Sequence, residues 1–462
     1  QETDIPASGR VFGCNNLNGT PQGTVLVRVA KTTGVTATEG SYAVNNIKPD
    51  KDTDTYEVQA VYGGGNLAAY EPWNTNATGQ YTTNHDATNR PLQVLIDGCD
   101  EASIEYVYGG GNAAATPSTA VIMLGCYEVD YLFGGGNGKD RISYDGGLNY
   151  LPNPGADVGM LGGANYGTGK ASVDVLGGTI HSIFGGSNTK GDVRESSVAY
   201  LDENSTCPLW VGEVYGGGNE AYMSGGSEVK LGCITSMNEL YGGAKAAPVG
   251  ADIVLPITSG HFDRVFGGNN ISGDISGSIT VNIEETGCKP VTIGELYGCG
   301  NQAAYTTPAG KTDPTINIKS CTSIGRVFGG GLGSTAVVTG NPTVNINEVT
   351  GLRSTYSPWT YPGSTITYAD GSSVTLPTHE SGKIGAIGTV FGGGNEAEVV
   401  GNTNVLVGTQ TGESIIFVSP EDATEAERTH TVEGADITGN VFGGGNNAKV
   451  TGNSNVVVGK SM

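Results

Sequence analysis

The sequence has no run of about 20 apolar residues, so it contains no candidate membrane-spanning helix. Basic residues are scarce, since the chain has 23 Lys and Arg residues against 46 Asp and Glu residues and a formal net charge of −23. Such an acidic chain is a poor match for nucleic acid or for an anionic membrane surface. Glycine contributes 77 of 462 residues without a G-X-Y period, which excludes a collagen triple helix. No segment shows a convincing helical period, so we expect an all-β fold.

A short string, V-F/Y-G-G-G-N, recurs along nearly the whole chain. Its aromatic positions lie 25 to 31 residues apart wherever no longer insertion intervenes. The string is almost intact at 61–66, 107–112, 214–219, 390–395 and 441–446. Variants surround Phe12, Phe133, Leu161, Phe184, Tyr241, Phe266, Tyr297 and Phe328. This self-similarity predicts about 13 structural repeats.

Each repeat also carries a second run in which apolar and polar residues alternate, as at 172–176, 279–283 and 404–407. Alternation of this kind is typical of a strand that is buried on one face. Short strands bury that face by stacking in parallel at about 4.8 Å, with glycine and asparagine at corners that need positive φ. A propeller blade needs about 40–50 residues, more than these repeats supply. We therefore predict one continuous single-stranded parallel β-helix over 1–462, right-handed because parallel crossovers strongly favour that hand.

The pattern V-F/Y-G-G-G-N-x-A followed by G-N-x-x-V-x-V resembles the repeat of large secreted or surface proteins of gut bacteria that form right-handed parallel β-helices. The resemblance covers nearly the whole chain. It implies an extracellular or cell-surface, adhesin-like or glycan-facing protein, and it transfers no catalytic residue.

The stacked arrangement turns each position of the repeat into a column. The position two residues before the aromatic holds Glu213, Glu239, Arg264, Glu295 and Arg326, which predicts a solvated ladder of attracting charges. Strict alternation would expose the aromatic residues as a binding stripe, whereas a bulge or corner at the glycines would turn them into the core. The frequent use of Phe favours a buried aromatic stack.

Eight cysteines recur in register, but no C-x-x-C or Cys/His cluster suggests a zinc site. The simplest interpretation is that free thiols fill a narrow column as small apolar groups. Disulfides between neighbouring coils, such as Cys99–Cys126, Cys207–Cys233 or Cys288–Cys321, remain an alternative because one coil rise lies within the permitted Cα separation.

One metal-like string occurs, with alternate carboxylates at Asp50, Asp52 and Asp54. Oxygen ligands of this kind suit calcium, although the spacing departs from an EF-hand loop. A solvated acidic loop is the simpler interpretation. No other cofactor is predicted.

Five insertions interrupt the repeats, at about 30–57, 67–90, 141–158, 351–383 and 411–434. Tyr and Trp in polar loops can stack on sugar rings or anchor a protein partner, and they can equally pin a loop onto the scaffold. The predicted ligand-binding residues are Tyr356, Trp359, Tyr361, Tyr368, Tyr70 and Trp73.

These features favour a non-enzymatic extracellular scaffold that binds a glycan or a host or cell-surface protein. A secreted polysaccharide lyase or glycoside hydrolase is the first alternative. Glycoside hydrolysis needs two carboxyl groups on adjacent coils that face a cleft, and no local motif singles out such a pair among the 46 acidic residues. A structural stalk is the second. The last strand, near 456–458, predicts further domains beyond Met462 or a partner at that edge.

Overall fold

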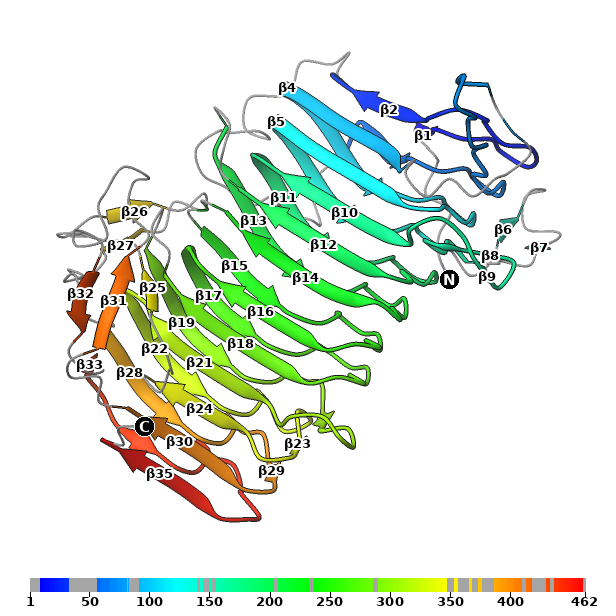
Figure 1. Ribbon diagram of the computed structural model, residues 1–462. Coiled ribbons are helices and arrows are strands. Elements are labelled where there is room, and N and C mark those ends of the chain that lie inside the picture. Colours follow the sequence, from blue (N-terminus) through cyan, green and yellow to red (C-terminus); the bar gives the residue numbers. More distant parts are fainter. Residues whose placement is uncertain are drawn as a thin grey trace. The chain divides into compact units, whose positions relative to one another are not determined.

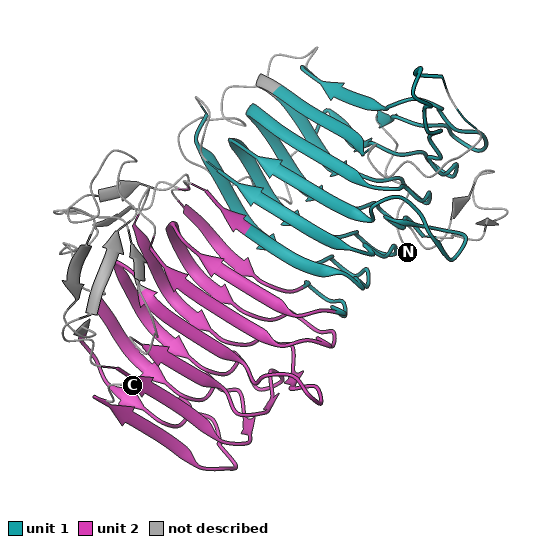
Figure 2. Ribbon diagram, in the orientation of Figure 1, with its two compact units in different colours: residues 1–229, 244–250 teal, residues 230–243, 251–462 magenta. Residues whose placement is uncertain are grey.

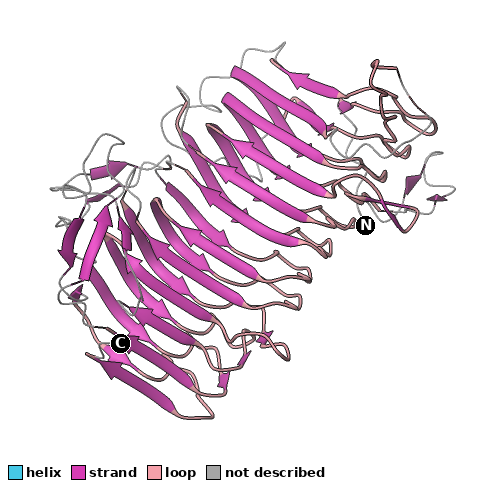
Figure 3. Cartoon of the chain, viewed as in Figure 1, coloured by secondary structure: helices cyan, strands magenta, loops and turns pink. Residues whose placement is uncertain are grey.

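The computed structural model describes residues 9–32, 56–80, 82, 91–138, 142–143, 150–151, 155–202, 207–232, 234, 236–285, 290–346, 353–355, 365–367, 373–375, 386–408, 413–417, 429–432 and 436–459. Their regular secondary structure consists of β-strands, with no helix among them (Figure 3). Accordingly, these residues include no helix that is long and apolar enough to cross a membrane.

The chain divides into two compact units (Figure 2). Unit 1 comprises Gln1–Val229 and Ala244–Gly250, and unit 2 comprises Lys230–Gly243 and Ala251–Met462.

The longer strands of unit 1 form parallel ladders (Figure 1), and two short hairpins accompany them. The ladder strands are β1 (Arg10–Phe12), β2 (Leu26–Val29), β3 (Val58–Tyr62), β4 (Leu92–Tyr108), β5 (Thr119–Phe133), β10 (Lys170–Val175), β11 (Gly178–Phe184), β12 (Ser196–Leu201) and β13 (Leu209–Tyr215). The hairpins pair β6 (Ile142–Ser143) with β7 (Tyr150–Leu151) and β8 (Met160–Leu161) with β9 (Ala164–Asn165). The strand β14 (Gly226–Leu231) contains the boundary between the units in the sequence.

Unit 2 repeats the same pattern of parallel ladders. Its principal strands are β15 (Ser236–Tyr241), β16 (Ile253–Ile257), β17 (Gly260–Phe266), β18 (Ile279–Glu284), β19 (Val291–Tyr297), β21 (Thr315–Ser320), β22 (Ser323–Phe328), β24 (Thr343–Ile346), β28 (Ala386–Phe391), β30 (Thr403–Val407), β33 (Asp436–Ile437), β34 (Val441–Phe442) and β35 (Ser454–Val458). Shorter strands are β20 (Tyr305–Thr306), β23 (Val338–Thr339), β25 (Arg353–Thr355), β26 (Thr365–Thr367), β27 (Ser373–Thr375), β29 (Val399–Val400), β31 (Glu413–Phe417) and β32 (Thr429–Val432).

Equivalent strands of successive repeats pair in parallel and in register. In unit 2, Phe266 of β17 lies opposite Tyr297 of β19, and Tyr297 lies opposite Phe328 of β22. The strands formed by the alternating apolar and polar runs also pair in parallel, β18 with β21 and β21 with β24. The predicted all-β, parallel, solenoid-like stacking is therefore confirmed within each unit.

The alternating runs bury one face, as their pattern predicts. In β18 the side chains of Ile279, Val281 and Ile283 are fully buried, and the polar residues between them are half-buried. The aliphatic face of each strand lies against those of its neighbours, so apolar burial supplies the main stabilisation of the stack.

The aromatic residues of the string form two continuous stacks. Ring centroids of successive repeats are 4.6–5.0 Å apart and the ring planes are nearly parallel. Unit 1 stacks Phe12, Tyr62, Tyr108, Phe133, Phe184 and Tyr215, and unit 2 stacks Tyr241, Phe266, Tyr297, Phe328, Phe391 and Phe442. The interior members are buried, whereas the terminal Phe442 is 46% exposed. The predicted buried aromatic stack is confirmed.

The rings nevertheless keep the alternation of the strand instead of turning into the aliphatic core. The hydroxyl of Tyr297 donates to the carboxylate of Glu295 over 2.8 Å, so the two side chains share one face of β19. Neighbouring rings and long charged side chains bury the stack from that side, as where the guanidinium of Arg326 lies 5.8 Å from the Phe328 ring centroid. A corner at the glycines is therefore not needed to explain the burial.

Close approach between repeats explains the glycines that follow the stacked aromatic residues. The expected positive φ is wrong for them, because none of these described glycines has one. A Cβ at Gly329 would lie 2.3 Å from the carbonyl oxygen of Gly392, and the Gly330 amide donates to Gly393 over 3.1 Å. Only glycine leaves room for backbones at this separation.

The variant string at Leu161 does not form a repeat, contrary to the sequence prediction. Leu161 belongs to the antiparallel β8–β9 hairpin, in which it pairs with Ala164. Gly162 and Gly163 have positive φ values of 58° and 83°, which the tight turn of this hairpin requires. A sequence similar to the repeated string thus adopts a different local structure here.

A disulfide joins Cys126 to Cys207, with their Cα atoms 5.3 Å apart. Cys126 lies in β5 and Cys207 lies two residues before β13, although β11 is between these two strands in the ladder. At the start of β11, Gly178 has φ of 87° and a Cβ there would lie 2.7 Å from the ring of Tyr127, the residue after Cys126.

The alternative pairings Cys99–Cys126 and Cys207–Cys233 are wrong, because Cys126 and Cys207 bond to each other. The pairing Cys288–Cys321 is wrong as well, because Cys321 forms no disulfide.

The remaining described cysteines, Cys14, Cys299 and Cys321, form no disulfide and keep their thiol groups. Burial raises the pKa of Cys14 to about 12 and raises the pKa of Cys321 well above its usual value. Thiols held in this form are poor nucleophiles, so these residues act as small apolar groups, as predicted.

Glu285 is a buried carboxyl group in unit 2. It accepts hydrogen bonds from the Val291 amide over 2.9 Å and from the Thr322 hydroxyl over 2.8 Å. Burial outweighs these bonds and raises the pKa of Glu285 from 4.5 to about 7. The folded protein therefore holds this proton over a pH range in which the unfolded chain has lost it.

Replacing one interior glycine should destabilise the stack. A Cβ at Gly393 would lie 2.9 Å from the backbone nitrogen of Gly445, so we expect Gly393→Ala to lower the free energy of unfolding by about 1–3 kcal/mol. The equivalent Gly444 has nothing within 4 Å of such a Cβ, so Gly444→Ala is the matched control, with an effect below about 0.5 kcal/mol. Urea denaturation measures both, and equal effects would contradict the close-approach explanation.

The Glu285 carboxyl should make stability decrease as pH rises from about 4.5 to about 7. Over this range the unfolded chain binds fewer protons than the folded protein, so Glu285 reduces the free energy of unfolding by up to about 3 kcal/mol. We expect Glu285→Gln to lose this decrease between pH 5 and pH 8, while Glu284→Gln, which removes the ion pair with Lys319, retains it. An unchanged pH dependence in Glu285→Gln would show that Glu285 ionises normally.

Candidate ligand pocket

Most of the residues predicted to bind ligand lie outside the described residues. These are Tyr356, Trp359, Tyr361 and Tyr368, together with the calcium candidates Asp50, Asp52 and Asp54. Among the residues that the structure does describe, no three His, Cys, Asp or Glu side chains gather into a metal site.

The other two predicted residues, Tyr70 and Trp73, lie in unit 1. Tyr70 is fully buried and its hydroxyl donates to the Gly23 carbonyl over 2.6 Å, while Trp73 is half-buried and its amide donates to the Gln22 carbonyl. Tyr70 therefore pins its insertion onto the preceding repeat and presents no surface to a ligand. Trp73 keeps some exposed surface.

A different place on unit 1 has a pocket, and the outer column of the ladder explains it. This column, two residues before each stacked aromatic residue, runs Arg10, Ala60, Tyr106, Tyr131, Ser182 and Glu213. Ala60 is a small residue between two large ones, so the column has no large side chain between Arg10 and Tyr106 and leaves a space there. The space is a pocket of about 190 Å³.

Aromatic rings and hydroxyl groups form one side of the pocket. Tyr62 and Tyr108 from the aromatic stack line it, together with Tyr106 from the outer column. The ring of Tyr106 stacks on Tyr108 with centroids 5.9 Å apart and on Tyr131 with centroids 5.1 Å apart. Because Tyr106 is held by these contacts yet only half-buried, its ring is a rigid platform at the pocket wall.

The phenol groups of the pocket stay protonated. Burial raises the pKa of Tyr62 to about 12, while Arg10 and Asn137 act in the opposite direction. Burial also raises the pKa of Tyr106, and the adjacent Glu105 and Asp130 carboxylates add to the effect. At neutral pH these groups are therefore hydroxyl donors.

A ladder of asparagine side chains, in contact with the tyrosine hydroxyl groups, also lines the pocket. The Asn137 amide donates to the Asn112 carbonyl oxygen over 2.8 Å, and the Asn188 amide donates to that of Asn137 over 2.9 Å. Asn188 also donates to the Tyr108 hydroxyl over 3.1 Å. The Asn residue of the repeated string thus serves two purposes, because it ties successive repeats together and presents amide groups to the pocket.

Two carboxyl groups lie near this site on neighbouring strands. Glu105 lines the pocket and lies between Ile104 and Tyr106, while Asp130 holds the same place in the next strand. Asp130 is buried at 3% exposure. The pair provides two carboxyl groups on adjacent strands, which is one part of the requirement of a glycosidase.

The outer column of unit 2 carries paired charges. Arg264 forms an ion pair with Glu239, and Arg326 forms one with Glu295. The predicted attraction between neighbouring charges of this column is confirmed for these residues, whose long paired side chains hold the column position that Ala60 holds in unit 1.

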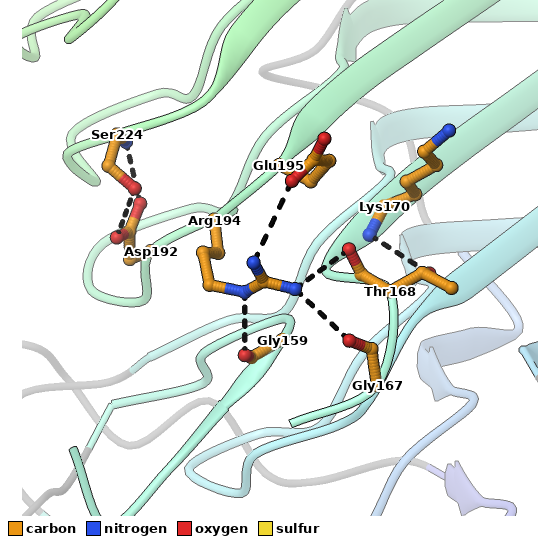
Figure 4. A network of polar contacts seen from close by, with 8 residues as sticks. All are labelled: Gly159, Gly167, Thr168, Lys170, Asp192, Arg194, Glu195 and Ser224. Atoms are coloured by element: carbon orange, nitrogen blue, oxygen red, sulfur yellow. Dashed lines mark hydrogen bonds and ion pairs between the residues drawn. The ribbon is translucent and has the colours of Figure 1, made fainter. Parts of the chain in front are cut away.

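A second polar cluster of unit 1 is structural. Arg194 donates hydrogen bonds to the backbone carbonyls of Gly159, Gly167 and Thr168 over 2.9–3.0 Å (Figure 4). Because the guanidinium is engaged by backbone oxygens on both sides of the β8–β9 hairpin, it fastens that hairpin to the ladder.

One histidine of unit 2 lies between a hydroxyl and a carboxylate, as in a hydrolase triad. His261 Nδ1 is 2.7 Å from Thr292 Oγ1, and Nε2 is 3.4 Å from Asp263 Oδ1. Thr292 is 4% exposed and therefore closed to a substrate. The arrangement has the order of a triad without an accessible nucleophile.

The chain matches no protein-family model, no curated protein and no solved structure. The pocket geometry is therefore the basis for assigning a function. Sequence reasoning missed the pocket because its residues come from five separate repeats. The one available signal was the alanine at position 60, where the repeats on either side carry Arg10 and Tyr106.

Proposed function

We propose that this protein is an extracellular or cell-surface scaffold that binds a glycan without catalysis, as an adhesin does. The observation that carries the proposal is the pocket beside Ala60, which is lined by a fixed tyrosine ring and by amide and hydroxyl groups. Aromatic faces together with planar hydrogen-bonding side chains are the chemistry that recognises sugar rings. The net charge of −23 and the disulfide support a secreted location.

The scaffold in this proposal is a single right-handed parallel β-helix with loop insertions. We assign it about 12 coils, one for each stacked aromatic residue of the described chain, where the string count predicted about 13. Ladder strands make the site rigid, because Arg10, Ala60 and Tyr106 lie on neighbouring strands that pair in register. A stalk would not need the break in the outer column at Ala60.

Filling the pocket should abolish binding and leave the fold intact. We expect Ala60→Tyr to place a third tyrosine in the column beside Tyr106, since Tyr106 and Tyr131 already stack there. A glycan array first identifies the glycans that the unmodified protein binds. The affinity for these glycans should fall at least about tenfold in the variant, because the new tyrosine side chain occupies the pocket and excludes the ligand. Calorimetric titration with the best glycan gives the affinity.

Thr389→Tyr is the matched control, because Thr389 occupies the same column next to Arg326 in unit 2. This variant should bind as the unmodified protein does. If Ala60→Tyr folds and binds glycans normally, the pocket is not the binding site. The scaffold would then have to bind glycans through its insertions.

A polysaccharide hydrolase is a second candidate function, favoured by the adjacent placement of Glu105 and Asp130. It requires that both carboxyl groups reach a glycosidic bond, and the burial of Asp130 weighs against this.

Incubation with acidic and neutral polysaccharides, followed by a reducing-end assay, separates the two functions. The binding proposal predicts no release of oligosaccharides above background, because only one of the two carboxyl groups lines the pocket. Release that Glu105→Gln abolishes would establish the hydrolase in its place, with Glu213→Gln in a distant repeat as the control.

A further inference from the structure

The polar groups of the pocket are not evenly distributed, and their arrangement bears on which sugar fits. Arg10 lies on one side of Ala60 in the outer column, and Tyr106 lies on the other side. Two strand spacings, about 9.6 Å, separate the backbones of these two residues. The pocket is thus open along the ladder direction between a cationic end and a tyrosine end.

The cationic end holds two hydrogen-bond donors. The Arg10 guanidinium lies 5.8 Å from the centroid of the Phe12 ring, and none of the described carboxylates forms an ion pair with it. The Tyr62 hydroxyl, on a side chain that is 3% exposed, receives a 3.4 Å contact from the Asn137 amide, and no described residue accepts its hydrogen. Both donors act on the same region, because the charge of Arg10 lowers the pKa of Tyr62 against the effect of burial.

The opposite end presents an acceptor. The Glu105 carboxylate lines the pocket beside Tyr106 and forms a hydrogen bond with that phenol. A carboxylate here accepts hydrogen bonds from the hydroxyl groups of a ligand and repels a ligand anion. A bound ring is therefore oriented, with an anionic group toward Arg10 and hydroxyl groups toward Glu105.

The size of the pocket restricts the ligand further. Its volume of about 190 Å³ lies below the roughly 300–1,000 Å³ of sites that hold drug-sized molecules. One ring with its substituents is the matching size. The half-buried face of Tyr106 gives the apolar surface on which the C–H face of a sugar ring stacks.

We propose that this pocket selects a sugar acid, a single hexuronate unit of an acidic glycan, over the corresponding neutral sugar. The proposal rests on the glycan-binding function and names its substrate class. Arg10 and the Tyr62 hydroxyl bind the carboxylate, Tyr106 stacks on the ring, and Glu105 with the asparagine ladder binds the ring hydroxyls. The overall negative charge does not prevent this, because distant exposed charges are screened beyond about 8 Å at physiological salt.

Glucuronate and glucose are the probes, because they differ only at the carboxylate or hydroxymethyl group. Ligand-observed NMR titration at 150 mM salt gives their affinities for the unmodified full chain, for Arg10→Gln and for Ala60→Tyr. Arg28→Gln is the matched control, since Arg28 is an exposed arginine of unit 1 that pairs with Asp97 and does not line the pocket. Far-ultraviolet circular dichroism confirms that each variant is folded.

We expect glucuronate to bind the unmodified protein about 10- to 100-fold more tightly than glucose, the range of a charge-assisted hydrogen bond. Arg10→Gln should remove this preference and keep the weaker binding of glucose, Ala60→Tyr should remove both, and Arg28→Gln should change neither.

Three results would overturn the inference in distinguishable ways. Equal binding of both sugars, lost in Ala60→Tyr, would reject the acid selectivity and leave the glycan pocket in place. An equal loss in Arg10→Gln and Arg28→Gln would show a non-specific charge effect. Absence of binding for both sugars and for their β-linked oligomers would reject the selectivity together with the proposed function.

Discussion

Successive repeats are held close together by direct contact between their glycine backbones, and the other contacts of the stack follow from this one. A Cβ at Gly134 would lie 2.4 Å from the Gly185 carbonyl oxygen, and the equivalent glycines of unit 2 are as close. This contact brings the preceding rings to van der Waals separation, so Phe133 and Phe184 stack with centroids 4.8 Å apart. The aromatic stack in turn fixes the register of both strand runs, because a shift by one residue would separate the rings and reverse the buried face.

A strictly regular stack has no sites, and the candidate site arises where regularity fails. Ala60 interrupts the outer column of unit 1 and opens the pocket, whereas paired charges such as Arg326 and Glu295 fill the column in unit 2. The repeated string itself provides the other residues that line the pocket, namely the stacked tyrosines and the asparagine ladder. A single small residue thus creates a binding site at little cost to the fold, because the ladder hydrogen bonds on either side are unaffected.

The sequence periodicity predicted the parallel stacking, the buried aromatic column and the charge ladder, because each follows from residues that recur at one position. Periodicity did not predict contacts between residues that occupy different positions of the repeat. The Cys126–Cys207 disulfide joins β5 to the segment before β13, with β11 between these strands, and Leu161 lies in a hairpin despite its repeat-like context. Aromatic residues in insertions suggested a ligand site, yet Tyr70 proved to be an internal anchor. The pocket combines residues from five repeats, and only the knowledge of which columns face outward makes the exception at Ala60 visible.

A crystal structure of the chain tests the central claim most directly, through the separation of the aromatic rings from repeat to repeat. In-register parallel stacking predicts that the rings of Phe266, Tyr297 and Phe328 follow one another with centroids 4.8 Å apart, with the Gly298 amide bonded to the Phe328 carbonyl. Rings lying more than about 7 Å apart, beyond the range of aromatic contact, or antiparallel pairing of β17, β19 and β22, would contradict the account.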